Sequence, residues 1–223
     1  MIPLYHDFSD ATVLVFGGGS VGARKARRFA READVVVVSP AFDDRFDEPA
    51  LAAVDRVRAA PDPEEATGWI DRVDPALVVA ATDDADLNAA VDAAARDHGT
   101  LVNRTDRSGG RDVDSVVVPA TVRDDPVSVA VSTGGESPAL ARYLRERIET
   151  EIQDAGAMAE LTGALRRDRK AEGQPPADRR AAVRSVVRSS SVWKALHTGT
   201  SNPRKEAERV MAAEHDDTDG ANR

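Results

Sequence analysis

The sequence of 223 residues predicts an α/β fold: a parallel sheet covered by helices on both faces, then a smaller α+β region and a helical region. Continuous apolar runs at 13–16, 35–38 and 77–82 are typical of strands that are buried on both faces. Helical segments lie between these runs, and this alternation indicates right-handed βαβ units. A glycine-rich segment directly after the first run indicates where a ligand would bind.

The first strand, 13–16, runs into the pattern G-x-G-x-x-G at Gly17, Gly19 and Gly22. The first glycine allows a sharp turn, the second lets a pyrophosphate approach the backbone, and the third lets the next helix pack closely. That helix, expected over 21–31, would direct its free N–H groups at the phosphates. The flanking strand and helix therefore predict a Rossmann-like dinucleotide site, and a purely structural glycine turn is the alternative.

The second strand, 35–38, ends at Ser39 and Pro40, because a proline cannot donate to a strand ladder. In many NAD-binding folds an acidic residue at this strand end holds the ribose hydroxyls. Ser39 takes that place here, and the nearest carboxylates, Asp43 and Asp44, follow the proline. No arginine comes directly after the strand, which favours NAD over NADP as the cofactor.

Further elements complete the expected parallel sheet. Short strands are predicted at 56–58 and 100–103, and prolines with early acids indicate a helix start at 61–65. Another helix is expected over 84–98. We therefore predict a Rossmann-like parallel sheet domain over residues 1–113, with the ligand crevice at the carboxyl ends of its strands.

The pattern changes in the second half of the chain. Two apolar strands, 115–120 and 127–132, are separated by a short polar link, which favours an antiparallel pair. From Pro138 apolar residues recur at intervals of three and four, as in an amphipathic helix. The expected division is a small α+β region over 114–152, a C-terminal helical domain over 153–213 and a disordered tail over 214–223.

Composition excludes several classes of site. The chain has no cysteine, which removes disulfides, thiolate metal sites and cysteine nucleophiles, and its four histidines match no metal-ligand spacing. We expect no metal site. No run approaches the roughly 20 apolar residues of a membrane span, and the first residues lack the basic and apolar parts of a signal peptide. A cytoplasmic protein without a membrane partner is expected.

The charged residues predict an acidic surface. The net charge is −9, which argues against a nucleic-acid partner. There are 26 aspartates and 13 glutamates against 26 arginines and only 4 lysines. A surface rich in aspartate and poor in lysine suits high salt, where screening weakens carboxylate repulsion. We therefore expect a halophilic protein, which would be wrong if it folded equally well without salt.

Three further polar clusters follow predicted strands or begin a helix. A carboxylate such as Asp106 could move a proton while a nicotinamide takes a hydride, although a turn or capping role fits its spacing alone better. The segment 133–138 is either a helix start capped by Ser137 or an anion-binding loop, and the two are compatible. Arg142 and Arg145 are either solvated or able to clamp acidic groups. The clusters are Thr82-Asp83-Asp84 with Asn88, Asn103-Arg104-Thr105-Asp106, and Thr133-Gly134-Gly135-Glu136-Ser137-Pro138.

Taken together, four motifs resemble the precorrin-2 dehydrogenase family, which is the dehydrogenase and chelatase part of siroheme synthases. The order and spacing of the motifs make the match specific over about residues 1–150. The motifs are the segment 16–26, the segment Ala80-Ala81-Thr82-Asp83-Asp84 with Asn88, the pair Val102-Asn103 followed by Asp106, and the segment 131–139.

The resemblance implies an activity and an assembly. The implied activity is NAD-dependent oxidation of the tetrapyrrole precorrin-2 to sirohydrochlorin in siroheme synthesis, with iron insertion in bifunctional members. The implied assembly is a homodimer, in which the α+β region over 114–152 is the dimerisation region. The methyltransferase half of fused siroheme synthases is missing, so we expect methylation to belong to another protein.

The resemblance also implies site residues. Asp106 corresponds to the family's catalytic aspartate, and Thr133 to the residue beside the tetrapyrrole site. Precorrin-2 carries eight carboxylates, and Arg104, Arg107 and Arg111, with Arg142 and Arg145, could hold them. The expected cofactor-binding residues are Gly17, Gly19, Ser20, Val21, Gly22, Ser39, Thr82 and Asp83, and the expected substrate-binding residues are Asn103, Thr133, Gly134, Gly135 and Arg142.

The sequence departs from the family pattern near Asp106. The link from Asp106 to the next strand is longer, and Arg104 and Thr105 replace apolar residues. Two other functions remain open: a non-catalytic NAD- or nucleotide-sensing regulatory domain, and a dehydrogenase of another small substrate. The regulatory domain would share the glycine loop but would not need Asp106.

Overall fold

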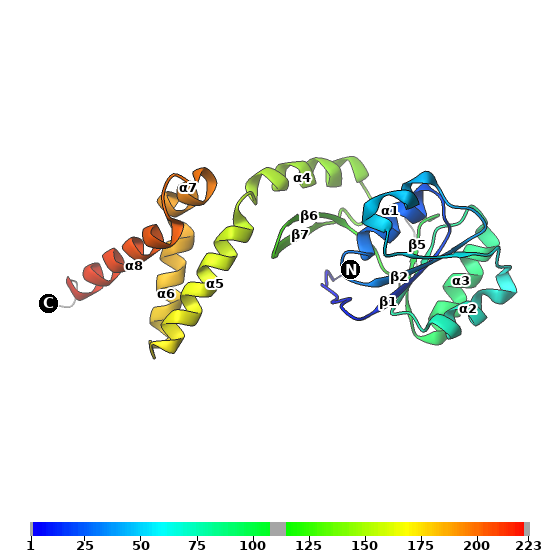
Figure 1. Ribbon diagram of the computed structural model, residues 1–223, viewed down its shortest axis with the longest axis horizontal. Coiled ribbons are helices and arrows are strands. Elements are labelled where there is room, and N and C mark those ends of the chain that lie inside the picture. Colours follow the sequence, from blue (N-terminus) through cyan, green and yellow to red (C-terminus); the bar gives the residue numbers. More distant parts are fainter. Residues whose placement is uncertain (1, 108–114, 221–223) are drawn as a thin grey trace. The chain divides into compact units, whose positions relative to one another are not determined.

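The computed structural model describes residues 2–107 and 115–220 and divides the chain into two compact units (Figure 1). The first unit comprises Met1–Val118 with Gly134–Glu136, and the second comprises Pro119–Thr133 with Ser137–Arg223. Most of the expected α+β region over 114–152 falls in the second unit, together with the C-terminal helices.

The first unit contains the predicted parallel sheet. Its strand order is β3-β2-β1-β4-β5, and each neighbouring pair is parallel. The order reverses its direction after β1, so the carboxyl ends of β1 and β4 form the switch point at which such sheets bind ligands. The strands are β1 (Thr12–Phe16), β2 (Asp34–Ser39), β3 (Asp55–Arg58), β4 (Leu77–Ala80) and β5 (Leu101–Arg104).

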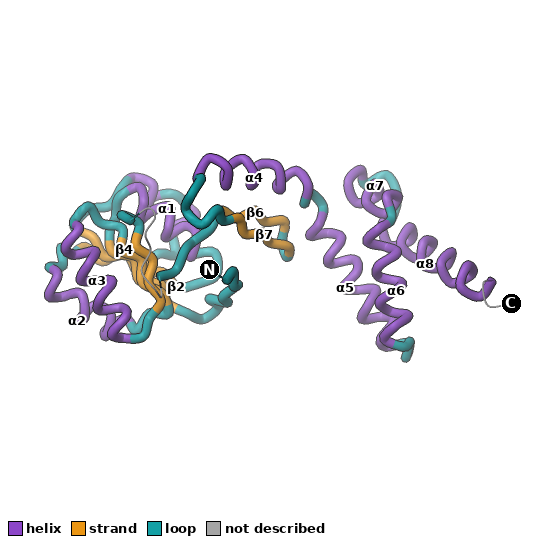
Figure 2. Tube along the Cα trace, turned by 180° about the vertical axis from the view of Figure 1, so that it is seen from behind, coloured by secondary structure: helices purple, strands orange, loops and turns teal. Residues whose placement is uncertain are grey.

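Helices cover both faces of this sheet (Figure 2). Both faces are apolar, because alternate side chains of each strand point to opposite faces. In β1, Val13 and Val15 pack towards α1, whereas Leu14 and Phe16 pack towards α2 and α3. All four side chains are fully buried, and each contributes about 1.5–3 kcal/mol of hydrophobic stabilisation. The covering elements are α1 (Ser20–Phe29), the 3-10 helices η1 (Asp44–Asp47), η2 (Pro49–Leu51) and η3 (Pro63–Glu65), and the helices α2 (Ala66–Val73) and α3 (Ala85–His98).

The ends of α3 have simple chemical causes. The carboxylate of Asp84 accepts hydrogen bonds from the N–H groups of Asp86, at 2.9 Å, and Leu87, at 3.0 Å. Gly99 ends the helix with a φ of +79°, a conformation that favours glycine. The helix predicted over 84–98 is thereby confirmed, and Asp84 is its N-cap residue.

The second unit begins with an antiparallel pair of strands, and here one prediction is wrong. The expected strand over 115–120 is an extended link in which only Ser115 bridges to Val102, and the strand starts at Ala120 instead. Pro119 has no N–H to donate, and the alternation that buries Val122 begins after it. The residues expected as a polar link therefore form β6 (Ala120–Asp124), which pairs with β7 (Val127–Val131).

Five helices follow, and four of them share a core. The buried side chains of this core are Met158 and Leu165, Ala182 and Val186, Val192, Ala207 and Met211. The last helix continues to Gly220 instead of ending near 213, because no proline or glycine interrupts residues 204–219. The helices are α4 (Pro138–Glu151), α5 (Ala155–Ala171), α6 (Pro176–Arg188), α7 (Ser190–Thr198) and α8 (Pro203–Gly220).

The helix α5 begins against the turn of the β6–β7 hairpin. The N–H of Gly156 donates to the carboxylate of Asp124 at 2.9 Å. A Cβ atom at position 156 would collide with the backbone oxygens of Asp125 and Asp124. Only glycine therefore fits at this contact without a backbone shift.

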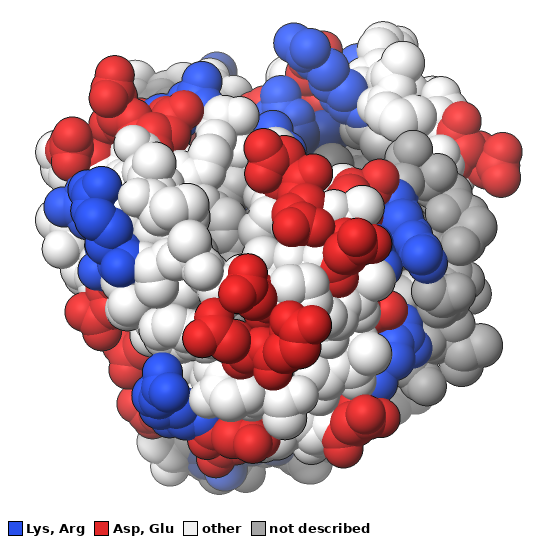
Figure 3. Space-filling model, turned by 90° about the vertical axis from the view of Figure 1, so that its right-hand side faces the viewer, with Lys and Arg blue, Asp and Glu red and all other residues white. Residues whose placement is uncertain are grey.

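The surface of the first unit is acidic, as the composition predicts. Figure 3 shows one face, on which aspartate and glutamate gather in several patches while lysine and arginine lie more towards its edges. Carboxylates at this density repel one another and hold water, so salt should stabilise the unit.

Candidate functional site

A pocket of about 790 Å³ lies at the carboxyl ends of β1, β2 and β4 in the first unit. Its volume is in the range of small-molecule and cofactor sites, which span about 300–1,000 Å³. The glycine loop, the segment after β2, the segment after β4 and the residues after β5 all contribute to its lining. The pocket is therefore at the switch point of the sheet, where the sequence predicts the ligand crevice.

The glycines of the loop have separate steric roles. Gly17 has a φ of +114°, and a Cβ there would collide with the Ala81 carbonyl at the end of β4. A Cβ at Gly22 would collide with the Gly17 carbonyl oxygen. At Gly19, by contrast, no atom of the described residues beyond its two chain neighbours lies within 4 Å of the Cβ position. Gly17 and Gly22 are thus needed by the fold, whereas the space at Gly19 is open to a ligand.

The start of α1 is prepared for an anion. Gly19 is the N-cap residue, with a φ of −75° and no side-chain capping hydrogen bond, and the first turn carries no acidic residue. The N-terminal amides and the positive end of the helix dipole therefore remain available to a negative group. A pyrophosphate fits this position, where Ser20 and Val21 line the pocket.

The segment after β4 is held by Asn88, which is buried at the start of α3. The Asn88 amide oxygen accepts from the hydroxyl of Thr82 at 2.8 Å, and its N–H₂ donates to the Thr82 carbonyl at 3.0 Å. Asn88 therefore fixes Thr82 instead of contacting a ligand. Thr82 and Asp83 line the pocket, as predicted.

The segment after β2 is tied to the glycine loop. Ser39 lines the pocket and is largely buried, and the N–H of Asp43 donates to the Gly18 carbonyl at 2.9 Å. Asp43 also lines the pocket, and its carboxylate caps η1 by accepting from the Arg45 N–H at 3.0 Å. Asp43 is therefore the carboxylate of this segment that the fold brings to the pocket, although a proline separates it from the strand.

Asp106 lines the same pocket as the glycine loop. Its carboxylate accepts two hydrogen bonds from Arg104, one from Nε at 3.0 Å and one from the terminal nitrogen at 2.5 Å. The Arg104 side chain is 9% exposed and that of Asp106 is 26% exposed. These hydrogen bonds hold the pKa of Asp106 below its ordinary value of 3.8, against the opposing effect of burial. Asp106 is thus an ionised carboxylate on the pocket wall.

Asn103 does not line this pocket, although the sequence predicts it as a substrate ligand. The side chain is 7% exposed, and Lys25 Nζ donates to its oxygen at 2.7 Å while its nitrogen donates to the Val116 carbonyl at 2.7 Å. Asn103 therefore joins α1, β5 and the following link. The sequence analysis did not single out Lys25 as a partner of Asn103. The signal that could have found it is the rarity of lysine, since the chain has only 4.

The segment that begins with Thr133 is a closed turn before α4. The Thr133 hydroxyl donates to the Ser137 carbonyl at 3.1 Å and accepts from its N–H at 3.2 Å. Gly134 and Gly135 have φ values of +68° and +96°, which favour glycine. Ser137 caps the helix by accepting from the Leu140 N–H at 3.2 Å, so the predicted helix start is confirmed.

Arg142 lies on α4 in the second unit, 80% exposed, and pairs with Glu146 at 3.1 Å. Arg145 pairs in the same way with Glu149 at 3.0 Å. These pairs fit the solvated alternative that the sequence left open. Arg111, another predicted substrate contact, lies outside the described residues.

Within residues 2–107 and 115–220, no helix is long and apolar enough to cross a membrane. The same residues contain no group of three or more histidine, aspartate or glutamate side chains arranged to hold a metal ion.

Comparison with known proteins agrees with this fold. A family model described as NAD(P)-binding matches residues 4–120, and one described as sirohaem biosynthesis protein central matches residues 124–151. The solved structure of SirC, a precorrin-2 dehydrogenase, superposes with a TM-score of 0.66 at 19% identity, over 96% of this chain and 100% of that chain. At this identity the superposition shows a shared fold.

Relatives of known name cover nearly the whole sequence. A precorrin-2 dehydrogenase from Methanosarcina barkeri is 32% identical over 95% of this chain and 92% of that protein. A siroheme synthase from Stutzerimonas stutzeri is 36% identical over 95% of this chain but only 43% of that protein. The chain thus spans less than half of the siroheme synthase. The family models and these relatives show that the chain belongs to the family of precorrin-2 dehydrogenases and siroheme synthases.

Proposed function

We propose that the protein oxidises precorrin-2 to sirohydrochlorin with NAD as the oxidant, in siroheme biosynthesis. A relative that covers 95% of this chain is named a precorrin-2 dehydrogenase, and an NAD(P)-binding family model matches residues 4–120. The observation that carries the proposal is the position of Asp106. Its ionised carboxylate lines the same pocket as the glycine loop, so a proton acceptor and a nucleotide cradle belong to one site.

The reaction removes two hydrogens from the tetrapyrrole and leaves one new double bond. Bound NAD supplies the acceptor for a hydride, and the second hydrogen leaves as a proton. Asp106 is the group proposed to take that proton, since its low pKa keeps it unprotonated at neutral pH. A carboxylate with a low pKa is a weak base, so the proton must pass on to water, and the partial exposure of Asp106 permits this.

The proposed cofactor contacts follow from the pocket lining. Gly19, Ser20 and Val21 would hold the pyrophosphate through backbone N–H groups. Ser39 would contact the ribose, and Thr82 and Asp83 would border the nicotinamide side of the pocket. Gly17 and Gly22 act indirectly, because they let the loop and α1 adopt this geometry.

The proposed substrate contacts come from the later segments. We propose that the tetrapyrrole substrate is contacted by Thr133, Gly134, Gly135 and Arg142. Asn103 would act by holding Lys25 and the link near Val116 in place, since both ends of its amide already have partners.

A homodimer is part of the proposal, together with a cytoplasmic location. The helix α4 has no buried residue, and its Leu140 and Tyr143 are exposed. Its partner, the β6–β7 pair, has only two strands, and such a hairpin is marginally stable alone in water. Light scattering with size-exclusion chromatography should give twice the chain mass of 23.8 kDa.

The decisive test compares Asp106→Asn with the unchanged protein under anaerobic conditions. Precorrin-2 oxidation, followed by sirohydrochlorin absorbance, should fall about 100- to 10,000-fold in the variant, because the proton acceptor is lost. NAD affinity should change less than about twofold. Asp86→Asn is the matched control, since Asp86 is an exposed carboxylate on α3 outside the pocket lining.

Two results would contradict the proposal. Full oxidation by Asp106→Asn would remove this carboxylate from the reaction. NAD binding by the unchanged protein without any oxidation of active precorrin-2 would favour the regulatory-domain alternative. Iron insertion into sirohydrochlorin, measured on the same three proteins, decides whether the protein also has the chelatase activity of bifunctional members.

A further inference from the structure

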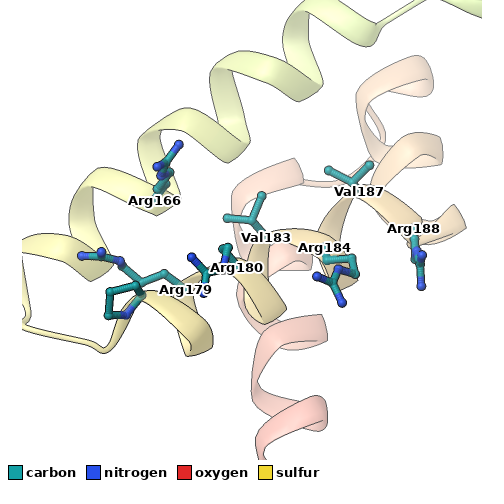
Figure 4. A pocket seen from close by; sticks show the side chains of 8 residues that line it. Arg166, Arg179, Arg180, Val183, Arg184, Val187 and Arg188 are labelled. Atoms are coloured by element: carbon teal, nitrogen blue, oxygen red, sulfur yellow. The ribbon is translucent and has the colours of Figure 1, made fainter.

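The C-terminal helices form a groove whose walls are mainly arginine. A cavity of about 420 Å³ lies between α5 and α6 (Figure 4). Its guanidinium groups come from Arg166 on α5 and from Arg179, Arg180, Arg184 and Arg188 on α6. We call this feature the arginine groove. Five positive side chains at one place are unusual in a chain with a net charge of −9.

The sequence spacing explains how the charges gather. Arg180, Arg184 and Arg188 are four residues apart, so they lie on one face of α6 with an axial rise of about 6 Å between neighbours. The row therefore extends about 12 Å along the helix. Arg166 adds a charge from the facing helix, so the groove is positive on both walls.

The five guanidinium charges of the arginine groove have no salt-bridge partner among the described residues. Other arginines of the second unit behave differently: Arg204 pairs with Asp168 at 2.6 Å, and Arg209 pairs with Glu206 at 2.6 Å. The five groove arginines thus differ from Arg204 and Arg209, whose charges have carboxylate partners.

The groove also has an apolar component. Val183 and Val187 line it from α6, one turn apart, and Val187 is 42% exposed. An exposed valine between guanidinium groups leaves apolar surface in water at the centre of a positive site. The chemistry that covers it has an apolar body surrounded by several anionic groups.

We propose that the arginine groove is an accessory binding site for a tetrapyrrole polycarboxylate. This inference rests on the proposed function, because precorrin-2 and sirohydrochlorin both have an apolar macrocycle with eight carboxylates at its rim. Arginine holds a carboxylate through two parallel N–H bonds, so several arginines in a row suit such a rim. The macrocycle would cover Val183 and Val187, and no chemical step takes place there.

The experiment uses the full chain with uroporphyrin, a fluorescent tetrapyrrole that has eight carboxylates. The unchanged protein should bind two molecules per chain, one in the proposed active site and one in the groove. Arg180→Ala with Arg184→Ala should abolish the second binding event or weaken it at least about tenfold, since two charged hydrogen-bonding groups are lost. Binding of uroporphyrin that Arg180→Ala with Arg184→Ala leaves unchanged in number and affinity would overturn the inference.

The matched control is a neighbouring pair on α5. Arg166 lines the groove and Arg167 does not, so Arg166→Ala should weaken the second event while Arg167→Ala leaves it within about twofold. If the double alanine variant loses helical circular dichroism, Arg180→Lys with Arg184→Lys keeps the charge but removes the paired N–H geometry. The lysine variant should bind uroporphyrin at this second site at least about threefold more weakly. Unchanged affinity would overturn the inference.

Two further measurements separate this inference from other outcomes. Heparin or single-stranded DNA that binds as tightly as uroporphyrin would mean a general polyanion surface and overturn it. Asp106→Asn should keep the second binding event even though oxidation fails, and the double alanine variant should keep oxidation at saturating precorrin-2. A failure of the proposed function is thereby distinguished from a failure of the groove.

Discussion

The nucleotide pocket and the arginine groove are built from different parts of the chain. The wall of the pocket at Gly17, Gly18 and Gly19 is backbone, and the N–H groups proposed to bind the pyrophosphate belong to the start of α1. The groove is lined mainly by arginine side chains of α5 and α6, together with Pro176, Val183 and Val187. A backbone site tolerates few substitutions at its glycines, whereas a side-chain site can lose one charge at a time.

The difference teaches how each site depends on the fold. A glycine replaced in the loop disturbs the contact of β1 with β4 or of α1 with its own loop. An arginine replaced in the groove leaves the buried core beneath it intact, because the core uses Leu165, Ala182 and Val186. Folding and binding are therefore coupled at Gly17 and Gly22 and separable in the groove.

The largest effect that tests this contrast is expected for Gly22→Ala. Its Cβ must displace the Gly17 carbonyl, which should lower the free energy of unfolding by about 1–3 kcal/mol and abolish NAD binding with it. Gly19→Ala is the control, because its Cβ enters open space. Gly19→Ala should lower the free energy of unfolding by about 1 kcal/mol or less and weaken NAD binding at least about tenfold. Urea unfolding and calorimetric NAD titration measure both, and equal stability losses in the two variants would contradict the contrast.

A smaller effect is expected where the pocket does depend on a charged pair. Arg104→Met removes the largest influence that lowers the pKa of Asp106, while burial still raises it. In the unchanged protein Asp106 loses its negative charge only as the pH falls through its depressed pKa, below 3.8. The acid limb of kcat/KM should therefore move to higher pH in the variant.

The free energy of unfolding should also decrease as the pH falls through the pKa of Asp106. The Arg104–Asp106 pair stabilises the fold at neutral pH, and this contribution is lost as the pH falls through the depressed pKa of Asp106. Arg107→Met is the comparison, since Arg107 has the smallest influence named on that pKa, so its acid limb should move less. An unmoved profile in Arg104→Met would mean that another group limits the reaction at low pH.

The smallest effect concerns salt. Raising KCl from 0.1 to 1 M should weaken uroporphyrin at the groove about tenfold, because screening acts on exposed charges, but NAD by only about threefold. Fluorescence titration at each salt concentration measures the two affinities. A groove that is less sensitive to salt than the pocket would reverse the contrast. Thermal unfolding in the same buffers reports whether the acidic surface gains stability from salt.

The sequence predicted the pocket well because its features are local. A glycine turn after a buried strand has few structural solutions, so β1, α1 and the switch point were predictable. The clamp on Asp106 was missed, although residues i and i+2 of an extended segment lie on the same side and Arg104 could have been paired with it. The strand over 115–120 failed because the run Val116–Val118 is more apolar than the alternating segment that forms β6.

The arginine groove could not be predicted in the same way. The row on α6 is visible in the sequence, but its use depends on Arg166 from α5 and on the absence of carboxylate partners in the described part of the second unit. Both depend on how two helices pack, which a local pattern does not specify. The sequence therefore predicted helices in this region without any site.

The hydrogen bond from Gly156 to Asp124 allows local opening of the second unit to be measured by hydrogen exchange at one amide. This N–H is in the first turn of α5, where helix amides lack an intrahelical partner, and only the hairpin side chain receives it. Its exchange with deuterated solvent should therefore be slow while α5 and the hairpin stay together and fast whenever they separate. All five later helices follow the β6–β7 hairpin in the chain. The exchange rate of this one amide would therefore report how often α5 separates from the hairpin within the second unit.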